Sequence, residues 1–520
     1  MPGSNVFSYE YDAAGQISGR TFPGSGGQKV SYTYLPGGLL STVRAPFLHQ
    51  ANPIYAYDAA ERLTKMVLPN DTTANYTFDG AGRLSRVTNK TPGGSTISDH
   101  QYTDIDGAGN RKTVVETNGS FSGAVNFTYD ALNRLFTSIY PNNQSLDHRR
   151  VDYTYNDSGD RLTATRYSSA DTSAQVSSTG YSYDANTGRM TAAGGANYCY
   201  DSNGNQTRRC GSSCSSGGDA FTYNVENHMT QAVVGGTTTA YTYNGDGVRT
   251  KKQITGGSTT DYYQDINGKL PVVAAEKVSS DWTYYVYGKN LIAKRESAGT
   301  PKYYHYDGSG NVRAITDATG AVVERYDYDA FGSLRSTAPS GSPNDRRFSG
   351  EQNDAETGLV FLRARYYDPA IGRFISKDPG HPTAARPQSL NQYSYAENNP
   401  VGLSTLFRNF GDVFSRQGLS SMAKVGRSRV QAREQVGEVG ASEPPLERLR
   451  DALVAFLKTE QAVIDLRQTG EVIRGQHLAL HHREVDLDLV QPTRVHRQVH
   501  WDKRGPRRLQ TFRRTRATMG

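Results

Sequence analysis

Hydrophobic and polar positions in the first 335 residues repeat a short pattern: an aromatic residue, any residue, a second aromatic residue, then Asp or Asn. One copy runs from Tyr55 through Tyr57 to Asp58, and Leu63 follows after a short polar stretch. Because residues i and i+2 of a strand face the same side, each copy places two rings on one face. The acidic or amide residue and the following Gly favour a tight turn, and the Leu begins a return strand. Each copy therefore predicts one β-hairpin.

The copies recur along most of the chain. A lone hairpin is marginally stable, so its ring-bearing face must be covered by neighbouring hairpins. Many hairpins in series form a sheet too long to stay flat, and strand twist curls it. We therefore expect an all-β fold of hairpins wound into a spiral shell or barrel; a Tyr-rich sandwich and a propeller with two copies in each blade are the alternatives. Further copies begin at Tyr76, Phe127, Tyr153, Tyr181, Tyr198, Phe221, Tyr241, Tyr304 and Tyr326, with degenerate copies at Tyr32 and Tyr102.

Composition agrees with this fold class. The chain has 520 residues with 34 Tyr and 53 Gly, and a mean hydropathy of −0.66 argues against one large apolar core. Tyr suits pleated strands and Gly suits tight turns. No apolar run is long enough for a transmembrane helix, and the start at Met1 lacks the pattern of a signal peptide. Since the repeats begin almost at once, we expect the chain to be a fragment of a longer protein.

Charge separates the C-terminal tail from the rest. Residues 408–520 hold 21 Lys and Arg against 13 Asp and Glu, whereas residues 1–407 hold 37 against 38. The overall net charge of +7 is therefore a property of the tail. It does not predict nucleic-acid binding by the main body.

The repeated Tyr-Asp pattern over residues 9–335 resembles the YD repeat of bacterial RHS proteins, toxin-complex C components, wall-associated proteins and teneurins. Residues 303–375 resemble the RHS repeat-associated core segment, which in that family closes the shell at its C-terminal end. Three domains are therefore expected: a YD-repeat array over 1–298, a core-associated segment over 299–407 and a variable basic tail over 408–520. The motifs that carry the second resemblance are Tyr326-Asp327-Tyr328-Asp329, Phe348-Ser349-Gly350-Glu351, Arg365-Tyr366-Tyr367-Asp368-Pro369 and Gly372-Arg373-Phe374.

The resemblance also implies a self-cleavage site, which this chain carries only in part. In the family two Asp-Pro motifs supply an aspartyl-protease-like pair that releases a C-terminal toxin. Asp378 matches the first aspartate and Arg365 matches an arginine linked to the cleavage, but the second aspartate, due near Thr405, is missing. Because such a pair works by sharing a proton, one carboxylate cannot replace it. We expect self-cleavage to be lost and Asp378 to serve as a turn residue.

The tail changes character after residue 407 and allows three interpretations. The three interpretations are a toxin cargo domain, an out-of-frame or recombined end without an evolved fold, and a basic arm for nucleic acid. A short helix is predicted between Leu446 and Leu457 from the spacing of its apolar residues. The histidines at 481, 482, 496 and 500 match no metal motif, so neither a metal nor a cofactor is predicted.

Three cysteines occur, Cys199, Cys210 and Cys214. Cys199 and Cys210 flank a predicted turn, which makes a cross-strand disulfide between them possible in an oxidising compartment. Free thiols in a Gly- and Ser-rich loop are the equal alternative. A zinc site with three cysteines would need a fourth ligand, and none is adjacent in the sequence.

Two functions compete at this point. The resemblance implies a secreted or cell-surface shell of a polymorphic toxin used in competition between bacteria. Its partners would be its own C-terminal cargo or a secretion-system spike or adaptor protein. The alternative is a surface module in which exposed Tyr rings bind carbohydrate or another partner. Ring orientation separates the two, because a shell requires the rings to face inward.

Overall fold

The computed structural model describes residues 6–24, 28–48, 54–142, 148–211, 214, 216–268, 270–296, 299–335, 344–380 and 387–403. The predicted helix in the tail and the tail histidines lie outside these residues. No helix in the described part is long and apolar enough to cross a membrane.

Strands β1 to β29 form one sheet in which each strand hydrogen-bonds to the next along the chain, always antiparallel. The fold is therefore the predicted series of hairpins. The strands are β1 (Ser8–Tyr11), β2 (Ile17–Thr21), β3 (Lys29–Tyr34), β4 (Leu40–Arg44), β5 (Ile54–Tyr57), β6 (Leu63–Val67), β7 (Thr73–Phe78), β8 (Leu84–Lys90), β9 (Thr96–Ile105), β10 (Arg111–Asn118), β11 (Phe121–Tyr129), β12 (Leu135–Ile139), β13 (Arg150–Tyr155), β14 (Arg161–Tyr167), β15 (Gln175–Tyr183), β16 (Met190–Ala193), β17 (Ala196–Tyr200), β18 (Gln206–Cys210), β19 (Asp219–Tyr223), β20 (Met229–Val234), β21 (Thr237–Tyr243), β22 (Arg249–Ile254), β23 (Thr259–Asp265), β24 (Val272–Val278), β25 (Asp281–Tyr287), β26 (Leu291–Glu296), β27 (Lys302–Tyr306), β28 (Val312–Thr316) and β29 (Val322–Arg325).

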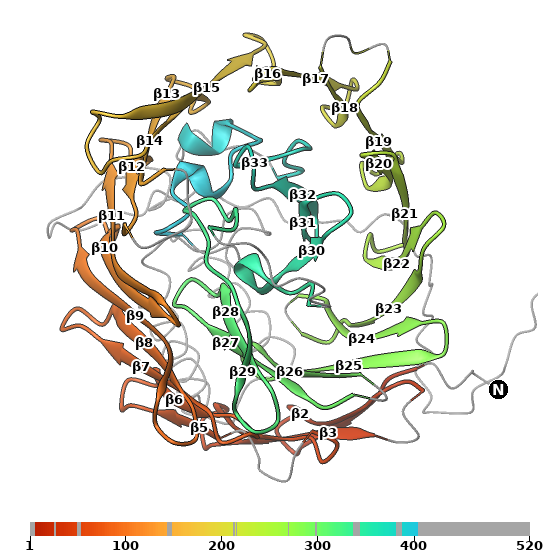
Figure 1. The fold of residues 1–520 in the computed structure, drawn as a ribbon. Helices are drawn as coiled ribbons and strands as arrows, with labels where there is room; N and C mark the ends of the chain where they lie inside the picture. Colours follow the sequence, from red (N-terminus) through yellow and green to blue (C-terminus); the bar gives the residue numbers. More distant parts are fainter. Residues whose placement is uncertain are drawn as a thin grey trace, which may run out of the picture. The chain divides into compact units, whose positions relative to one another are not determined.

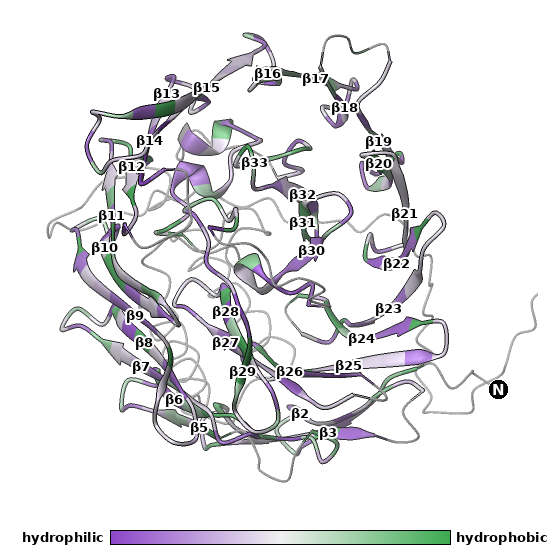
Figure 2. Cartoon of the chain, viewed as in Figure 1, coloured by the Kyte–Doolittle hydropathy of each residue, from purple (hydrophilic) through white to green (hydrophobic). Residues whose placement is uncertain are grey.

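A second, four-stranded sheet follows, and we call residues 344–403 around it the inner segment. Its strands are β30 (Gln352–Asp354), β31 (Leu359–Leu362), β32 (Arg365–Asp368) and β33 (Arg373–Phe374), and its 3-10 turns are η1 (Phe348–Gly350), η2 (Pro387–Leu390) and η3 (Ala396–Asn398). Figure 1 shows the sheet of β1–β29 as a curved wall with this segment on its concave side. Hydrophilic and hydrophobic residues alternate along many wall strands in Figure 2, as expected for strands with one covered face.

The acidic residue of each repeat makes the turn. Asp58 Oδ1 accepts the backbone N–H groups of Ala60 and Arg62 at 2.9 and 3.0 Å, and its Oδ2 accepts the Arg62 guanidinium. The same arrangement recurs at Asp79 and Asp130. A carboxylate that accepts hydrogen bonds from the backbone of its own turn stabilises the turn conformation. The repeat residue that gives the motif its name thus sets where each hairpin reverses.

The second aromatic of each repeat joins one hairpin to the hairpin before it. The Tyr155 hydroxyl donates to the carbonyl of Leu135 at 2.8 Å, and Tyr129 donates to Arg111 at 2.7 Å. A β-bulge lies at the same position, for example between Thr154 and Tyr155. Bulges increase local strand twist, so their regular recurrence favours a curved sheet. The same hydroxyl contact is made by Tyr34, Tyr57, Tyr183, Tyr243, Tyr306 and Tyr328.

We expect Tyr155→Phe to lower the free energy of unfolding by about 0.5–1.5 kcal/mol, because it removes one hydrogen bond and keeps the ring. Tyr11→Phe is the matched control, since the Tyr11 ring is 56% exposed, and it should change little. Guanidinium unfolding of both variants measures the difference. Equal stability of the two variants would show that the repeated hydroxyl contact does not hold the hairpins together.

The wall closes by bringing its early strands against its late ones. The Phe22 ring after β2 lies 5.3 Å from the Tyr284 ring of β25. The Asn70 amide donates to Thr316 of β28 at 2.9 Å, and the Asn89 amide of β8 donates to the Tyr306 carbonyl at 3.0 Å. These residues are more than 200 positions apart in the chain. Side-chain contacts therefore join the two ends of a sheet that has no ladder hydrogen bonds between them.

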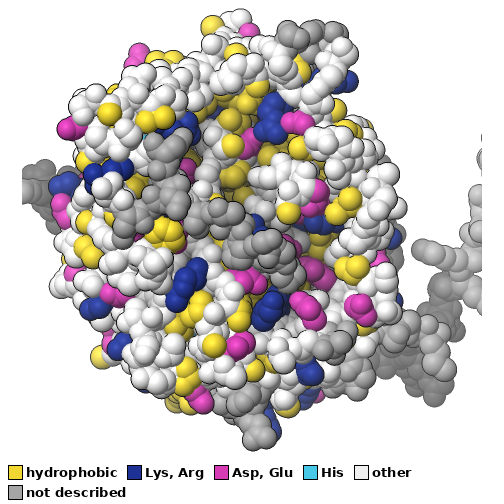
Figure 3. Space-filling model, in the orientation of Figure 1, with side chains coloured by type: hydrophobic (Ala, Val, Ile, Leu, Met, Phe, Trp, Pro, Cys, Tyr) yellow, Lys and Arg dark blue, Asp and Glu magenta, His cyan; other side chains and the backbone are white. Residues whose placement is uncertain are grey.

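The first aromatic of most repeats is buried on the concave side of the wall. The Tyr153 ring lies 5.3 Å from Phe331, in the chain that leads to the inner segment, and the Tyr241 ring lies 5.5 Å from Tyr366 of β32. Ten of the twelve first aromatics are buried, and Tyr32 and Tyr76 are partly buried. Hydrophobic side chains are visible between the wall near β15–β17 and the inner segment in Figure 3. This inward orientation favours the shell over a module with exposed binding rings.

Two repeats differ from the sequence expectation. The copy at Tyr326 predicts a hairpin strand, but β29 ends at Arg325 and the chain then leaves the wall, with only an isolated bridge between Tyr328 and Leu334. Conversely, β25 ends in Tyr285 and Tyr287 and forms a repeat hairpin that the pattern missed. The reason is that Gly288 stands where the acidic turn residue is expected.

Candidate functional site

The structure brings the two residues of the predicted cleavage remnant together. Arg365 Nη2 lies 2.7 Å from Asp378 Oδ2, and Arg365 Nη1 donates to the Gln392 carbonyl at 3.0 Å. The guanidinium also stacks on the Phe374 ring at 3.6 Å. Burial lowers the pKa of Arg365 to about 10, although the Asp378 carboxylate opposes this shift. Arg365 is thus a buried cation held by one partly exposed carboxylate.

Asp378 also forms a turn, as the sequence indicates for an Asp-Pro pair. Its Oδ1 accepts the Gly380 N–H at 2.8 Å, and its own N–H donates to the Gln392 carbonyl at 3.0 Å. Both carboxylate oxygens therefore have partners. The position of the expected second aspartate, near Thr405, lies outside the described residues, and the sequence holds no Asp between 379 and 411. The geometry suits an anchor for the inner segment.

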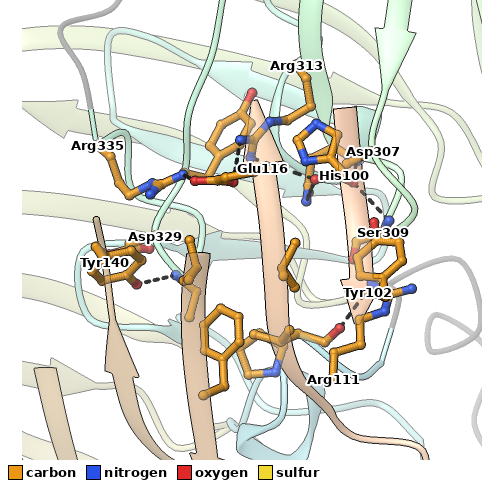
Figure 4. A pocket seen from close by; sticks show the side chains of 18 of the residues that line it. His100, Tyr102, Arg111, Glu116, Tyr140, Asp307, Ser309, Arg313, Asp329 and Arg335 are labelled. Atoms are coloured by element: carbon orange, nitrogen blue, oxygen red, sulfur yellow. Dashed lines mark hydrogen bonds and ion pairs between the residues drawn. The ribbon is translucent and has the colours of Figure 1, made fainter. Parts of the chain in front are cut away.

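A second cluster of titratable groups lines a cavity of about 70 Å³ between wall strands β9–β12 and residues 307–335. Figure 4 shows the Glu116 carboxylate of β10 between two guanidinium groups. Glu116 accepts from Arg313 at 2.9 Å and from Arg335, and Asp327 accepts from Arg313 at 2.7 Å. The two arginines hold the pKa of Glu116 at about 2, against the effect of its burial.

This cluster joins the wall to the returning chain. The Tyr140 hydroxyl accepts the Ala330 N–H at 3.0 Å, and the Tyr102 hydroxyl accepts the Gly308 N–H at 2.7 Å. A carboxylate held between two arginines is a poor proton acceptor, because protonation would remove its attraction to both cations. The cluster is therefore better suited to fixing the inner segment than to acid–base catalysis.

Burial in this cavity makes His100 a source of acid sensitivity. Its pKa is lowered to about 4, mainly because burial disfavours the imidazolium and also because Arg313 is near. The unfolded chain therefore binds a proton more readily than the folded chain between pH about 6.5 and 4. The free energy of unfolding therefore falls by about 3 kcal/mol in total as the pH drops from 6.5 to about 4.

This pH dependence is measurable by unfolding the protein at pH 7 and at pH 4.5. The loss on acidification should be smaller in His100→Asn than in the wild type. His228→Asn is the control, because His228 stacks on Tyr243 and does not line this cavity. An identical pH dependence in wild type and His100→Asn would contradict the account of this cavity.

The predicted disulfide between Cys199 and Cys210 is wrong. The structure joins Cys199 to Cys214, and Cys210 is a buried free thiol. The reason is the register of the hairpin, which sets Cys199 opposite Arg208 and Cys210 opposite Asn197. Cys210 is thus two residues away from the position that faces Cys199.

Buried arginines that join the wall to the inner segment were not found from the sequence. Arg249 of β22 binds Asp354 of β30 at 2.6 Å with both side chains fully buried, and Arg373 of β33 binds Asp160 at 2.9 Å. A signal for the wall arginines does exist. The fifth residue after the turn Asp or Asn is apolar in most repeats, for example Leu63, Leu84 and Leu135, but among the exceptions it is Arg at 111, 161 and 249. At each of these the guanidinium lies on the first aromatic of its own hairpin, on Tyr102, Tyr153 and Tyr241 respectively.

Comparison with known proteins gives a consistent result. The family model of the teneurin YD-shell matches residues 3–190 and 147–401. The chain is 30% identical over 406 residues to the tRNA3(Ser)-specific nuclease WapA of Bacillus spizizenii, a match that covers 76% of this chain and 14% of the relative. It is 27% identical over 335 residues to the double-stranded DNA deaminase toxin A of Burkholderia cenocepacia, covering 57% of this chain and 21% of that protein.

Solved structures agree on the fold. The crystal structure of TcdB2-TccC3-Cdc42 superposes with a TM-score of 0.62 at 19% identity, over 76% of this chain and 21% of that one. The crystal structure of TcdB2-TccC3 gives the same TM-score of 0.62 at 20% identity. The chain thus spans only a small part of the length of each of these proteins.

Proposed function

Because the chain belongs to the teneurin YD-shell family and is an RHS-type shell segment, we propose that it closes a shell around a C-terminal cargo for delivery from one bacterium into another. The orientation of the repeat rings carries this proposal. Buried rings on the concave side cover the chain inside the wall, as an enclosing wall requires.

The end of the inner segment also supports an enclosed cargo. The Asn399 amide donates to Asn110 at 2.8 Å and to the Asn133 carbonyl at 2.7 Å, so the chain is fixed to two turns of the wall just before the tail. Val401 and Leu403 pack against the main core. A polypeptide that continues from there begins beside the concave face of the wall.

The partners follow from this role. The tail over 408–520 would be the cargo, and a secretion-system spike or adaptor protein would carry the closed shell to a secreted or cell-surface location. The names of the relatives include nucleases of tRNA and a deaminase of DNA, so a cargo that acts on nucleic acid is the class we propose for a functional tail. An out-of-frame tail remains the rival interpretation.

A competition assay tests the function. A strain with the intact locus, a strain with a stop codon at position 408 and a strain with the locus deleted are each mixed with a sibling that lacks the neighbouring immunity gene. We expect the intact strain alone to reduce the survival of the sibling. Equal survival with all three strains would contradict delivery of this tail, and killing retained with the stop codon would show that the tail is not the cargo.

We expect the purified full chain to remain one species of 57.0 kDa, because the missing second aspartate removes the acid or the base of the cleaving pair. Intact-mass measurement after prolonged incubation tests this. A fragment that begins between residues 400 and 415, and that disappears in Asp378→Asn, would show that another residue has taken the missing role.

A further inference from the structure

The three cysteines lie together on the outer face of the wall. Tyr198 and Tyr200 of β17 point inward, where Tyr200 meets Tyr393 at 5.9 Å, so Cys199 between them points outward. On the partner strand β18, Arg209 reaches inward to Asp368 at 3.1 Å. Cys210 therefore points outward as well.

The loop after β18 brings the third sulfur to the same place. The Arg208 guanidinium donates to the Gly217 carbonyl at 3.1 Å, which holds the end of this loop against the strand. Gly218 has a φ of +68°, and a Cβ atom there would collide with the Arg209 carbonyl, so the return requires glycine. With the loop fixed in this way, the sulfurs of Cys199, Cys210 and Cys214 lie within 4.8 Å of one another.

The arrangement is better suited to a soft metal ion than to a disulfide alone. A disulfide uses two sulfurs and leaves the buried Cys210 thiol beside it with one long hydrogen bond, 3.7 Å to the Asn197 carbonyl. Three thiolates around one ion, with metal–sulfur bonds of about 2.3 Å, would lie about 4 Å apart, which is compatible with the clustering here. No His, Asp or Glu joins the three sulfurs in the described part of the chain.

The number of ligands indicates which metal ion this site can hold. Structural zinc sites are almost always four-coordinate, whereas thiolates also select Cu(I). We propose that Cys199, Cys210 and Cys214 form a trithiolate site for Cu(I) on the outer face of the wall, and that the disulfide between Cys199 and Cys214 is the oxidised form of this site.

The two forms exclude each other chemically. Binding replaces three S–H bonds with three metal–sulfur bonds and releases three protons, with no change in oxidation state. A low-molecular-weight disulfide converts the metal-free thiols of Cys199 and Cys214 to the disulfide by two exchange steps, and is itself reduced to two thiols. The site would thus bind metal in a reducing compartment and lock the loop by a disulfide in an oxidising one.

Titration of the reduced full chain with Cu(I) under anaerobic conditions, in competition with a chromogenic Cu(I) chelator, tests the proposal. We expect three titratable thiols and one Cu(I) bound per chain, with X-ray absorption giving three sulfur neighbours. The disulfide form should show one thiol and no tight binding. Cys210→Ser should weaken binding more than about 100-fold, because even partners outside the ligand shell contribute about 10- to 100-fold.

Two results would overturn the proposal. One is Cu(I) binding of equal affinity in the wild type and in Cys210→Ser, which would mean that two sulfurs suffice. The other is a reduced wild-type chain with three free thiols that binds no stoichiometric Cu(I), or that binds Zn²⁺ in preference to it. The X-ray absorption measurement uses the wild type alone, so it decides the question even where the variant folds poorly.

Discussion

Replacing Arg249 with Met is expected to lower the free energy of unfolding by about 3–5 kcal/mol, because it leaves a buried carboxylate without its main partner. Arg249 binds Asp354 and also donates to Gln352 at 2.8 Å and to the Tyr366 hydroxyl at 2.9 Å. The Arg249 and Asp354 side chains are both 0% exposed. Only Lys252, at 3.4 Å, would still contact Asp354.

The double variant Arg249→Met with Asp354→Leu sharpens this prediction. Without the carboxylate no buried charge is left unpaired, and Lys252 keeps its partner Glu356 at 2.9 Å. We therefore expect the double variant to be more stable than Arg249→Met alone. Lys251→Met is the control, because the exposed pair of Lys251 with Asp261 contributes less than about 1 kcal/mol. Chemical unfolding of the wild type and these three variants tests the prediction, and equal stability of Arg249→Met and Lys251→Met would contradict it.

Glu116→Gln should have an effect of similar size, about 3–5 kcal/mol at neutral pH. The amide keeps the shape of the side chain but leaves Arg313 with Asp327 at 2.7 Å and Asp307 at 3.8 Å, and Arg335 with Asp327 at 3.9 Å. The wall would lose a main charged link to the chain that returns inside it.

The pH dependence of stability identifies why Glu116→Gln lowers the free energy of unfolding. The folded-state pKa of Glu116 is about 2, below the ordinary value of 4.5. The contribution of Glu116 to the free energy of unfolding is therefore present above a pH of about 4.5 and is lost as the pH falls toward 2. The stability difference between wild type and Glu116→Gln should shrink between pH 5 and pH 2.5. Glu226→Gln, at an exposed turn position, is the control, and a difference that does not vary with pH would assign the loss to packing.

The hairpins were predictable from sequence because their causes are local. The Asp58 turn, the ring pair of Tyr55 and Tyr57 and the return strand all lie within a dozen residues, so a short pattern captures them. The same reasoning failed at Tyr326, where the motif is present but the chain has to leave the wall. Contacts with distant residues distinguish that copy, such as the amide of Asn344, which donates to the Tyr326 hydroxyl at 3.3 Å.

The links across the interior were not predictable in the same way. Arg249 and Asp354 are 105 positions apart, and nothing local marks Asp354 as its partner. The position of Arg249 within its repeat does carry information, because Arg111, Arg161 and Arg249 all stand where most repeats have an apolar residue, and each lies on the first aromatic of its hairpin. The cysteine pairing failed for a smaller reason, since flanking the same turn does not place two residues opposite each other, and the register sets Cys199 opposite Arg208, two residues before Cys210.

An experimental structure of the full chain, by crystallography or electron cryomicroscopy, tests the central claim most directly. The account predicts one continuous antiparallel wall whose first aromatics point at the inner segment, with Tyr241 against Tyr366 and Arg249 bound to Asp354. Separate four-stranded blades around a channel, or repeat rings that face solvent with residues 344–403 outside the wall, would contradict it.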